Sequence, residues 1–229
     1  MDGTVLESLP FDLELPEILR ALRIREHSSH VEAVSGLVGQ ALVIGRPKAV
    51  YKIGYIEDKG PDSITVDGLK FTSRVLRVNL DQAQRVFVYI CTAGHELEAW
   101  TDSQDDMVAH YYADAISERV LRGARMALAQ LWQQRYELAE TAEMNPGSLP
   151  DWPLKEQRVL FTLLGDTQST IGVELLSSLL MKPRKTVSGF VFPTAETFAS
   201  CQLCPRTTCP NRRAPYDPDL FDRKYRETA

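Results

Sequence analysis

The segment 86–91, which reads Val-Phe-Val-Tyr-Ile-Cys, constrains the fold more than any other part of the chain. Its residues are apolar or aromatic without a polar alternation, which is the pattern of a strand buried on both faces. Gly94 follows shortly after, and glycine allows the chain to turn sharply at the end of a strand. We therefore predict a central strand over 86–91.

A helical pattern of unusual length begins near Ser103 and continues to about Ala139. Ser103 is the expected N-cap, and Asp105 and Asp106 fall in the first turn, where carboxylates complement the helix dipole. We expect either one long helix or a helix that bends near Gly123. The buried stripe of this helix is predicted to comprise Val108, Tyr112, Ala115, Ile116, Val120 and Ala124.

The remaining elements are predicted from periodicity and from glycine and proline punctuation. Two helices are expected within 14–44, strands over 50–56, 63–66, 75–78 and 186–192, a helical turn at 81–84, and short helices over 154–164 and 173–181. The proline-rich residues after 193 predict an irregular segment on the surface.

Composition indicates a globular protein, with 44% hydrophobic and 25% charged residues among 229. The net charge of −5 argues against nonspecific binding to nucleic acid, which requires a basic surface. Apolar runs are too short to cross a bilayer, and the acidic first residues do not form a signal peptide. We expect a cytoplasmic protein with neither a nucleic acid nor a membrane partner.

Two segments, 144–153 and 171–192, carry the combined motifs Asn-Pro-Gly, Met-Lys-Pro and Val-Ser-Gly. Together they resemble the activation (reactivation) domain of vitamin B12-dependent methionine synthase, and the similarity is clearest over about 85–200. The resemblance implies an α+β fold with a twisted, mainly antiparallel sheet flanked by helices. We expect an N-terminal helical segment at 1–48, an activation-domain-like core at 49–200 and a cysteine-containing tail at 201–229.

In the family, a loop of the form Arg-x-x-Pro-Gly-Tyr holds S-adenosylmethionine. Here Glu143 and Ser148 stand at the arginine and tyrosine positions, and Arg122 falls at the position of an acidic helix residue. Because the charges of the amino-acid clamp are reversed or lost, we predict weak or absent S-adenosylmethionine binding. The ligand platform implied by the resemblance comprises Pro146, Gly147, Ser148, Ser188, Gly189 and Phe198, although a Pro-Gly turn and a Ser-Gly strand also arise for chain geometry alone.

Three of the four cysteines, Cys201, Cys204 and Cys209, form a compact cluster in the tail. Cys-x-x-Cys spacing suits a metal shared by two thiolates, and these ligands suit zinc or an iron–sulfur cluster. Cys91 is the candidate fourth ligand and His95 the next one. Three reduced thiols without a metal remain an alternative.

No catalytic triad, paired-carboxylate motif or nucleotide fingerprint is visible, so catalysis by this chain alone is not expected. The sequence also has no Asp-x-His-x-x-Gly segment to supply an axial histidine to cobalamin. The leading hypothesis is an accessory protein that supports reductive reactivation of cobalamin carried by a corrinoid-binding methionine synthase or methyltransferase, with an electron-donor protein as a further partner. The alternatives are a small-molecule module that binds S-adenosylmethionine or a corrinoid without a redox role, and a methyltransferase subunit.

Overall fold

The computed structural model describes residues 3–194, 198–209 and 211–226. Within these residues, seven strands form one sheet in the order β4-β3-β2-β5-β9-β6, and β1 pairs with β2 beside this path. All of their pairings are antiparallel. These strands are β1 (Thr4–Leu6), β2 (Lys48–Lys59), β3 (Ser63–Val66), β4 (Leu69–Thr72), β5 (Arg85–Thr92), β6 (Thr141–Met144) and β9 (Thr186–Pro193).

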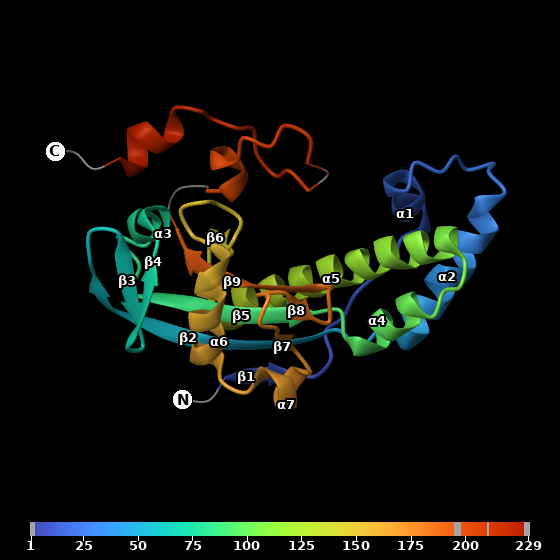
Figure 1. The fold of residues 1–229 in the computed structure, drawn as a ribbon, viewed down its shortest axis with the longest axis horizontal. Coiled ribbons are helices and arrows are strands. Elements are labelled where there is room, and N and C mark those ends of the chain that lie inside the picture. The colour runs from blue at the N-terminus through green and yellow to red at the C-terminus, as the bar shows by residue number, and fades with distance from the viewer. Residues whose placement is uncertain (1–2, 195–197, 210, 227–229) are drawn as a thin grey trace.

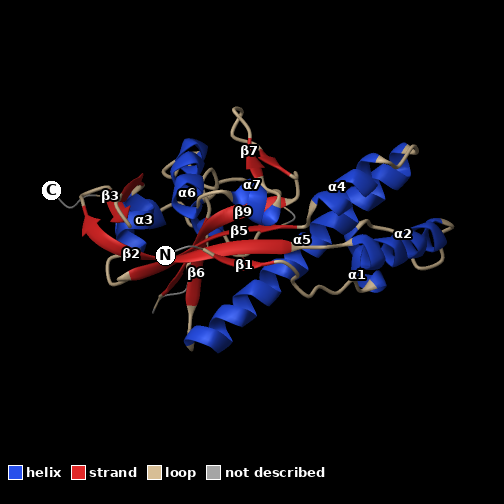
Figure 2. Ribbon diagram, turned by 90° about the horizontal axis from the view of Figure 1, so that it is seen from below, coloured by secondary structure: helices blue, strands red, loops and turns tan. Residues whose placement is uncertain are grey.

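Helices cover both faces of this sheet, as Figures 1 and 2 show. The first face carries α5 and, at one end of the sheet, the bundle of α1, α2 and α4; the second face carries α3, α6 and α7. The helices are α1 (Leu15–Ala21), α2 (His30–Ile44), α3 (Arg74–Asn79), α4 (His95–Asp102), α5 (Met107–Tyr136), α6 (Gln157–Leu164) and α7 (Thr167–Ile171). The predicted α+β class, with an antiparallel sheet flanked by helices, is therefore confirmed.

The strand predicted over 86–91 lies inside β5 and is buried on both faces. Alternation along β5 places Phe87, Tyr89 and Cys91 in the core beneath α5. Val88 and Ile90 point into the opposite core with α3 and α6. The central strand is therefore shared by two separate cores, one on each side of the sheet.

The long helix is confirmed as α5, but it begins at Met107 and not at Ser103. Its N-cap is Asp106, whose carboxylate accepts a hydrogen bond from the Ala109 amide at 2.8 Å. The preceding residues form the separate helix α4, which starts directly after Gly94. Gly94 has φ +99°, so the predicted sharp turn at this glycine is confirmed.

Three short segments differ from the sequence prediction, and the first, 81–84, forms bends between α3 and β5 and not a helical turn. Residues 75–78 lie in helix α3 and not in a strand, because Ser73 caps the helix by accepting from the Leu76 amide at 2.9 Å. The helix predicted over 173–181 is instead a hairpin of β7 (Glu174–Leu175) and β8 (Met181–Lys182). Helix α7 ends at Gly172, which adopts the left-handed conformation with φ +73° and stops the helix there.

The C-terminal segment runs along one edge of the molecule, past β6 and towards α3 (Figure 1). It contains two short helical turns, Ser200–Leu203 and Phe221–Tyr225. Elsewhere in the chain, a similar turn at Leu154–Glu156 directly precedes α6. The first described residues of the C-terminal segment contact β6, where Ala199 forms a parallel bridge with Glu143. This contact brings the cysteine-containing tail next to the strand that precedes the Asn-Pro-Gly loop.

Candidate functional site

Glu143 is a carboxylate on the face of the sheet that α5 covers. It pairs in register with Val191 of β9, and Val191 belongs to the core beneath α5. Its neighbours Ala142 and Met144 point into the opposite core. A carboxylate in this position is costly unless other groups neutralise it and bond to it.

Four side chains meet this carboxylate, and its own exposure is 16%. Arg125 of α5 donates through Nη2 to both oxygens, at 2.6 and 2.5 Å. The Tyr89 hydroxyl donates to Oε1, and Asn145 Nδ2 donates to the same oxygen at 3.0 Å. Arg213 of the tail donates to Oε2 at 3.1 Å. Strand, helix, loop and tail therefore converge on Glu143.

The network fixes the protonation states of its members. Burial opposes ionisation of Glu143, but the charge of Arg125 and the hydrogen bonds from Tyr89 and Asn145 hold its pKa below the usual value. The pKa of Tyr89 lies well above its usual value, because of burial and the neighbouring charge of Glu143. Tyr89 is therefore a neutral donor to an ionised carboxylate.

Asn145 joins this network to the predicted residues Ser188 and Gly189. Its Nδ2 donates to the Ser188 carbonyl at 2.9 Å and approaches the Tyr89 hydroxyl at 3.3 Å. A Cβ atom on Gly189 would lie 2.5 Å from both Asn145 Nδ2 and the Met144 carbonyl oxygen. Gly189 therefore permits close approach of the loop to β9, and the Asn145 side chain occupies the space that a larger residue would fill.

The Pro-Gly loop is a tight turn anchored by an aromatic residue. Gly147 has φ +82°, and its amide donates to the Trp152 carbonyl at 2.7 Å. Trp152 is fully buried, with its ring 5.2 Å from that of Phe190, so it anchors the loop in the second core. Pro146 is buried, whereas Ser148 is exposed.

The other two platform residues lie on the second face of the sheet. Ser188 is buried there, and its hydroxyl accepts from Gln157 Nε2 at 3.1 Å. Phe198 packs in the second core with its ring 6.4 Å from that of Tyr225. The structure therefore brings Ser188 and Gly189 to the loop but directs Phe198 away from the Glu143 network.

A groove of about 270 Å³ opens beside Glu143 on the α5 face. It combines charged groups with an apolar wall. Its lining residues are Tyr89, Arg122, Arg125, Met126, Leu128, Ala129, Trp132, Glu143, Val191 and Arg213.

The four cysteines differ in environment. Cys91 is fully buried beneath α5, and burial raises the pKa of its thiol to about 12. Cys201 is partly exposed; burial opposes its ionisation, but amide hydrogen bonds from Arg213 and Ala214 and the charge of Arg213 hold its pKa below the usual value. Among the described residues, no three His, Cys, Asp or Glu side chains form a group that could hold a metal ion. The metal site on Cys201, Cys204, Cys209 and Cys91 therefore stays a prediction.

The cysteine loop is folded around one guanidinium. Arg212 donates through Nη1 to the carbonyls of Cys201 and Ala214, both at 3.0 Å. Through Nη2 it donates to the Cys204 carbonyl at 3.0 Å and to the Arg206 carbonyl. The backbone that carries the thiols is thus ordered by a side chain of the chain itself.

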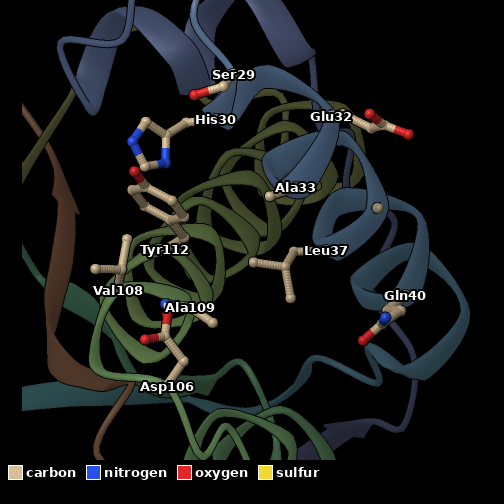
Figure 3. Close-up of a pocket in the computed structure, with 11 residues that line it drawn as sticks. Ser29, His30, Glu32, Ala33, Leu37, Gln40, Asp106, Val108, Ala109 and Tyr112 are labelled. Carbon is tan, nitrogen blue, oxygen red and sulfur yellow. Dashed lines mark hydrogen bonds between the residues drawn. The ribbon is translucent and has the colours of Figure 1, made fainter.

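A second groove, of about 630 Å³, lies between α2 and the start of α5 (Figure 3). His30 and Tyr112 meet at one side of it with ring centroids 5.9 Å apart, and Leu37 forms part of its floor. Beside it, Met107 and Tyr111 are 86% and 58% exposed. None of the ligand-platform residues predicted from the sequence lines this groove.

Sequence reasoning missed Tyr89, Arg125, Asn145 and Arg213 as members of one site. Two signals were present. Tyr89 is the polar-tipped residue in an otherwise apolar buried strand, so its hydroxyl needs a partner. Arg125 lies four residues after the buried Leu121 on α5, so its charge also needs a partner near the core.

Comparisons with known proteins give similarity to solved structures. No protein-family model and no curated protein matches the sequence. Among solved structures, the MetH reactivation domain bound to AdoHcy matches over 87% of this chain and 82% of its own, with 16% identity and a TM-score of 0.55. The chain therefore has the fold of the MetH reactivation domain.

None of the helices in the described part of the chain is long and apolar enough to cross a bilayer.

Proposed function

We propose that this protein is an accessory factor that docks on a separate corrinoid-dependent methionine synthase or methyltransferase and supports reductive reactivation of its cobalamin. The observation that carries the proposal is the shared fold with the MetH reactivation domain over most of both chains. In this role the cobalamin belongs to the partner, and an electron-donor protein supplies one electron to cob(II)alamin.

The Glu143 network supports a role in which S-adenosylmethionine is not held tightly by this chain. The carboxylate of that ligand would approach Glu143, which is ionised and already bonded to Arg125. A ligand carboxylate placed against Glu143 itself, at the position that the resemblance implies, is opposed by repulsion between the two carboxylates and by the need to break a charge-assisted pair. We propose that the loop serves as a rigid part of the platform.

We place the docking surface at the groove between α2 and α5, with Met107, Val108 and Tyr111 beside or within it. Large apolar side chains clustered on a surface are typical of protein interaction sites. The proposed occupant is the corrinoid-carrying domain of the partner.

The test uses a methionine synthase whose own activation domain has been deleted and whose cobalamin is in the cob(II)alamin state, mixed with a reductant. Addition of the full chain is expected to speed the loss of the cob(II)alamin absorption band. Serum albumin at the same concentration is the control. An unchanged rate together with no complex in sedimentation would overturn the proposal, and ligand binding by the isolated, metal-free protein would then favour the binding-module alternative.

The metal prediction has its own test. Anaerobic purification followed by iron, zinc and acid-labile sulfide analysis would assign an electron-relaying role if iron and sulfide are present. Zinc would assign a structural role to the cysteine loop. Metal-free protein would restrict the proposed function to docking.

A further inference from the structure

The groove beside Glu143 holds an excess of positive charge. Three guanidinium groups, those of Arg122, Arg125 and Arg213, line it together with the single carboxylate of Glu143. An arginine remains charged at any pH that a folded protein tolerates. The groove therefore favours an anion over a neutral or cationic group.

Most of the donors on these guanidinium groups remain available. Glu143 engages only Nη2 of Arg125 and Nη1 of Arg213. Arg122 is exposed and makes no hydrogen bond or ion pair with any residue in the described part of the chain. Since a guanidinium carries five N–H groups, an anion can bond to Arg122 and Arg213 without displacing Glu143.

An apolar wall lies in the same groove, beside the buried indole of Trp132. The indole Nε1 of Trp132 is buried without a hydrogen-bond partner in the described structure, and Trp132 lines the groove. Met126, Ala129 and Val191 supply apolar surface beside it. A ligand that matches both the arginine-lined part and the apolar wall of the groove carries an oxyanion at one end and an apolar body at the other.

We propose that this groove is a binding site for a small organic oxyanion, a carboxylate or phosphate ester, whose charged end contacts Arg122 and Arg213 and whose apolar body lies against Met126 and Trp132. At about 270 Å³ the groove is smaller than the roughly 300–1,000 Å³ of sites for drug-sized ligands, which limits the ligand to a small molecule. The inference goes beyond the proposed docking role and does not depend on it.

The indole N–H resonance of Trp132 provides a direct readout. In protein labelled with ¹⁵N, the three tryptophan indoles are resolved by NMR and Trp132 is assigned with Trp132→Phe. Benzoate and phenyl phosphate are titrated separately, with benzamide as the neutral isostere of benzoate. We expect saturable shifts of the Trp132 indole with both anions, and the tighter one identifies the preferred headgroup. Benzamide producing the same shift as benzoate, or no saturable shift with either anion, would overturn the proposal.

Two arginine variants test the site. Arg122→Gln is expected to weaken the binding of the tighter anion about tenfold, the size expected for loss of one charge-assisted bond. Arg119→Gln is the matched control on the same helix, because Arg119 is directed to Glu17 at 3.4 Å and does not line this groove. Equal affinities in the two variants would contradict the proposed contact. Unchanged indole resonances of Trp100 and Trp152 report that both variants are folded.

Discussion

Arg125 on α5 donates through one nitrogen to both carboxylate oxygens of Glu143 on β6, at 2.6 and 2.5 Å. The pair links the long helix to the edge strand of the sheet across 18 residues of sequence. The side chain of Arg125 is 33% exposed and that of Glu143 is 16% exposed. Together they form an ion pair between α5 and β6, the strand that precedes the Asn-Pro-Gly loop.

Removal of one partner from this pair is expected to destabilise the protein strongly. Arg125→Met should lower the free energy of unfolding by about 2–4 kcal/mol, because it leaves the Glu143 carboxylate poorly compensated. The double variant Arg125→Met/Glu143→Met should recover much of the lost stability, because the Glu143 carboxylate is then removed together with its partner. Urea unfolding of the single and double variants measures the coupling. Additive losses in the double variant would argue against a direct interaction.

Stability should depend on pH through Glu143. Its pKa in the folded protein lies below the usual value, so the stabilisation from its ionised form is fully present above about pH 4.3 and is lost as the pH falls through the folded pKa. Unfolding of the wild-type protein and of Glu143→Gln, compared between about pH 6 and pH 3, should show a smaller acid dependence in the variant. Parallel curves would show that other carboxyl groups dominate.

Gly189 is expected to tolerate no side chain. Gly189→Ala would place a Cβ 2.5 Å from the Met144 backbone oxygen, so the strand pair β6–β9 must separate locally. We expect a loss of about 1–3 kcal/mol in thermal or urea unfolding. Gly36→Ala is the matched control, because nothing lies within 4 Å of its Cβ position in helix α2. This control should be neutral or stabilising by up to about 1 kcal/mol.

The cysteines should react in a fixed order. Iodoacetamide at pH 7.5 is expected to modify Cys201 well before Cys91, because the thiolate is the reactive form. Cys201 has a lowered pKa and partial exposure, whereas Cys91 is buried with a pKa of about 12. Peptide mass spectrometry over time measures both rates, and Cys201→Ser confirms the assignment. Modification of Cys91 in the folded protein at a comparable rate would contradict its placement beneath α5.

Docking on the corrinoid partner should depend on the exposed apolar residues of α5. Met107→Ser/Tyr111→Ser is expected to weaken binding to the partner by about tenfold or more, because large exposed apolar side chains often dominate an interface. Leu180→Ser is the control: Leu180 is 62% exposed but lies in the β7–β8 hairpin. Calorimetric titration of the partner measures both affinities. Equal weakening by the control would place the interface elsewhere.

The sequence predicted elements whose pattern is strong and local. The buried strand at 86–91, the helix over 154–164 and the strand at 186–192 follow from apolar runs and periodicity, and all three are present. The predicted start of α5 was too early, because Ser103 and Asp106 are both good N-caps. Only the three-dimensional path of the chain shows that α4 ends before α5 begins. Leucine-rich residues after Gly172 resembled a helix, but few of them are buried, so packing did not enforce one.

The candidate site was predictable in part. Its loop and the glycine on β9 follow from motif spacing, and the reversed charge at Glu143 was evident. The identity of the neutralising partners was not, because Arg125 and Arg213 reach Glu143 from 18 and 70 residues away. Such pairings depend on the strand order and on the path of the tail, which local patterns do not encode.

The position of β9 between β5 and β6 has a consequence for how the protein folds during synthesis. Val191 is the shared neighbour of Phe87 and Glu143, so neither the central strand nor the edge strand acquires its final partner until the ribosome has passed β9. Contacts this distant in sequence close late, since the intervening chain must first be ordered. A nascent chain arrested before β9 would therefore carry α5 and the Asn-Pro-Gly loop but no assembled groove, and fragments that end there should not substitute for the whole protein.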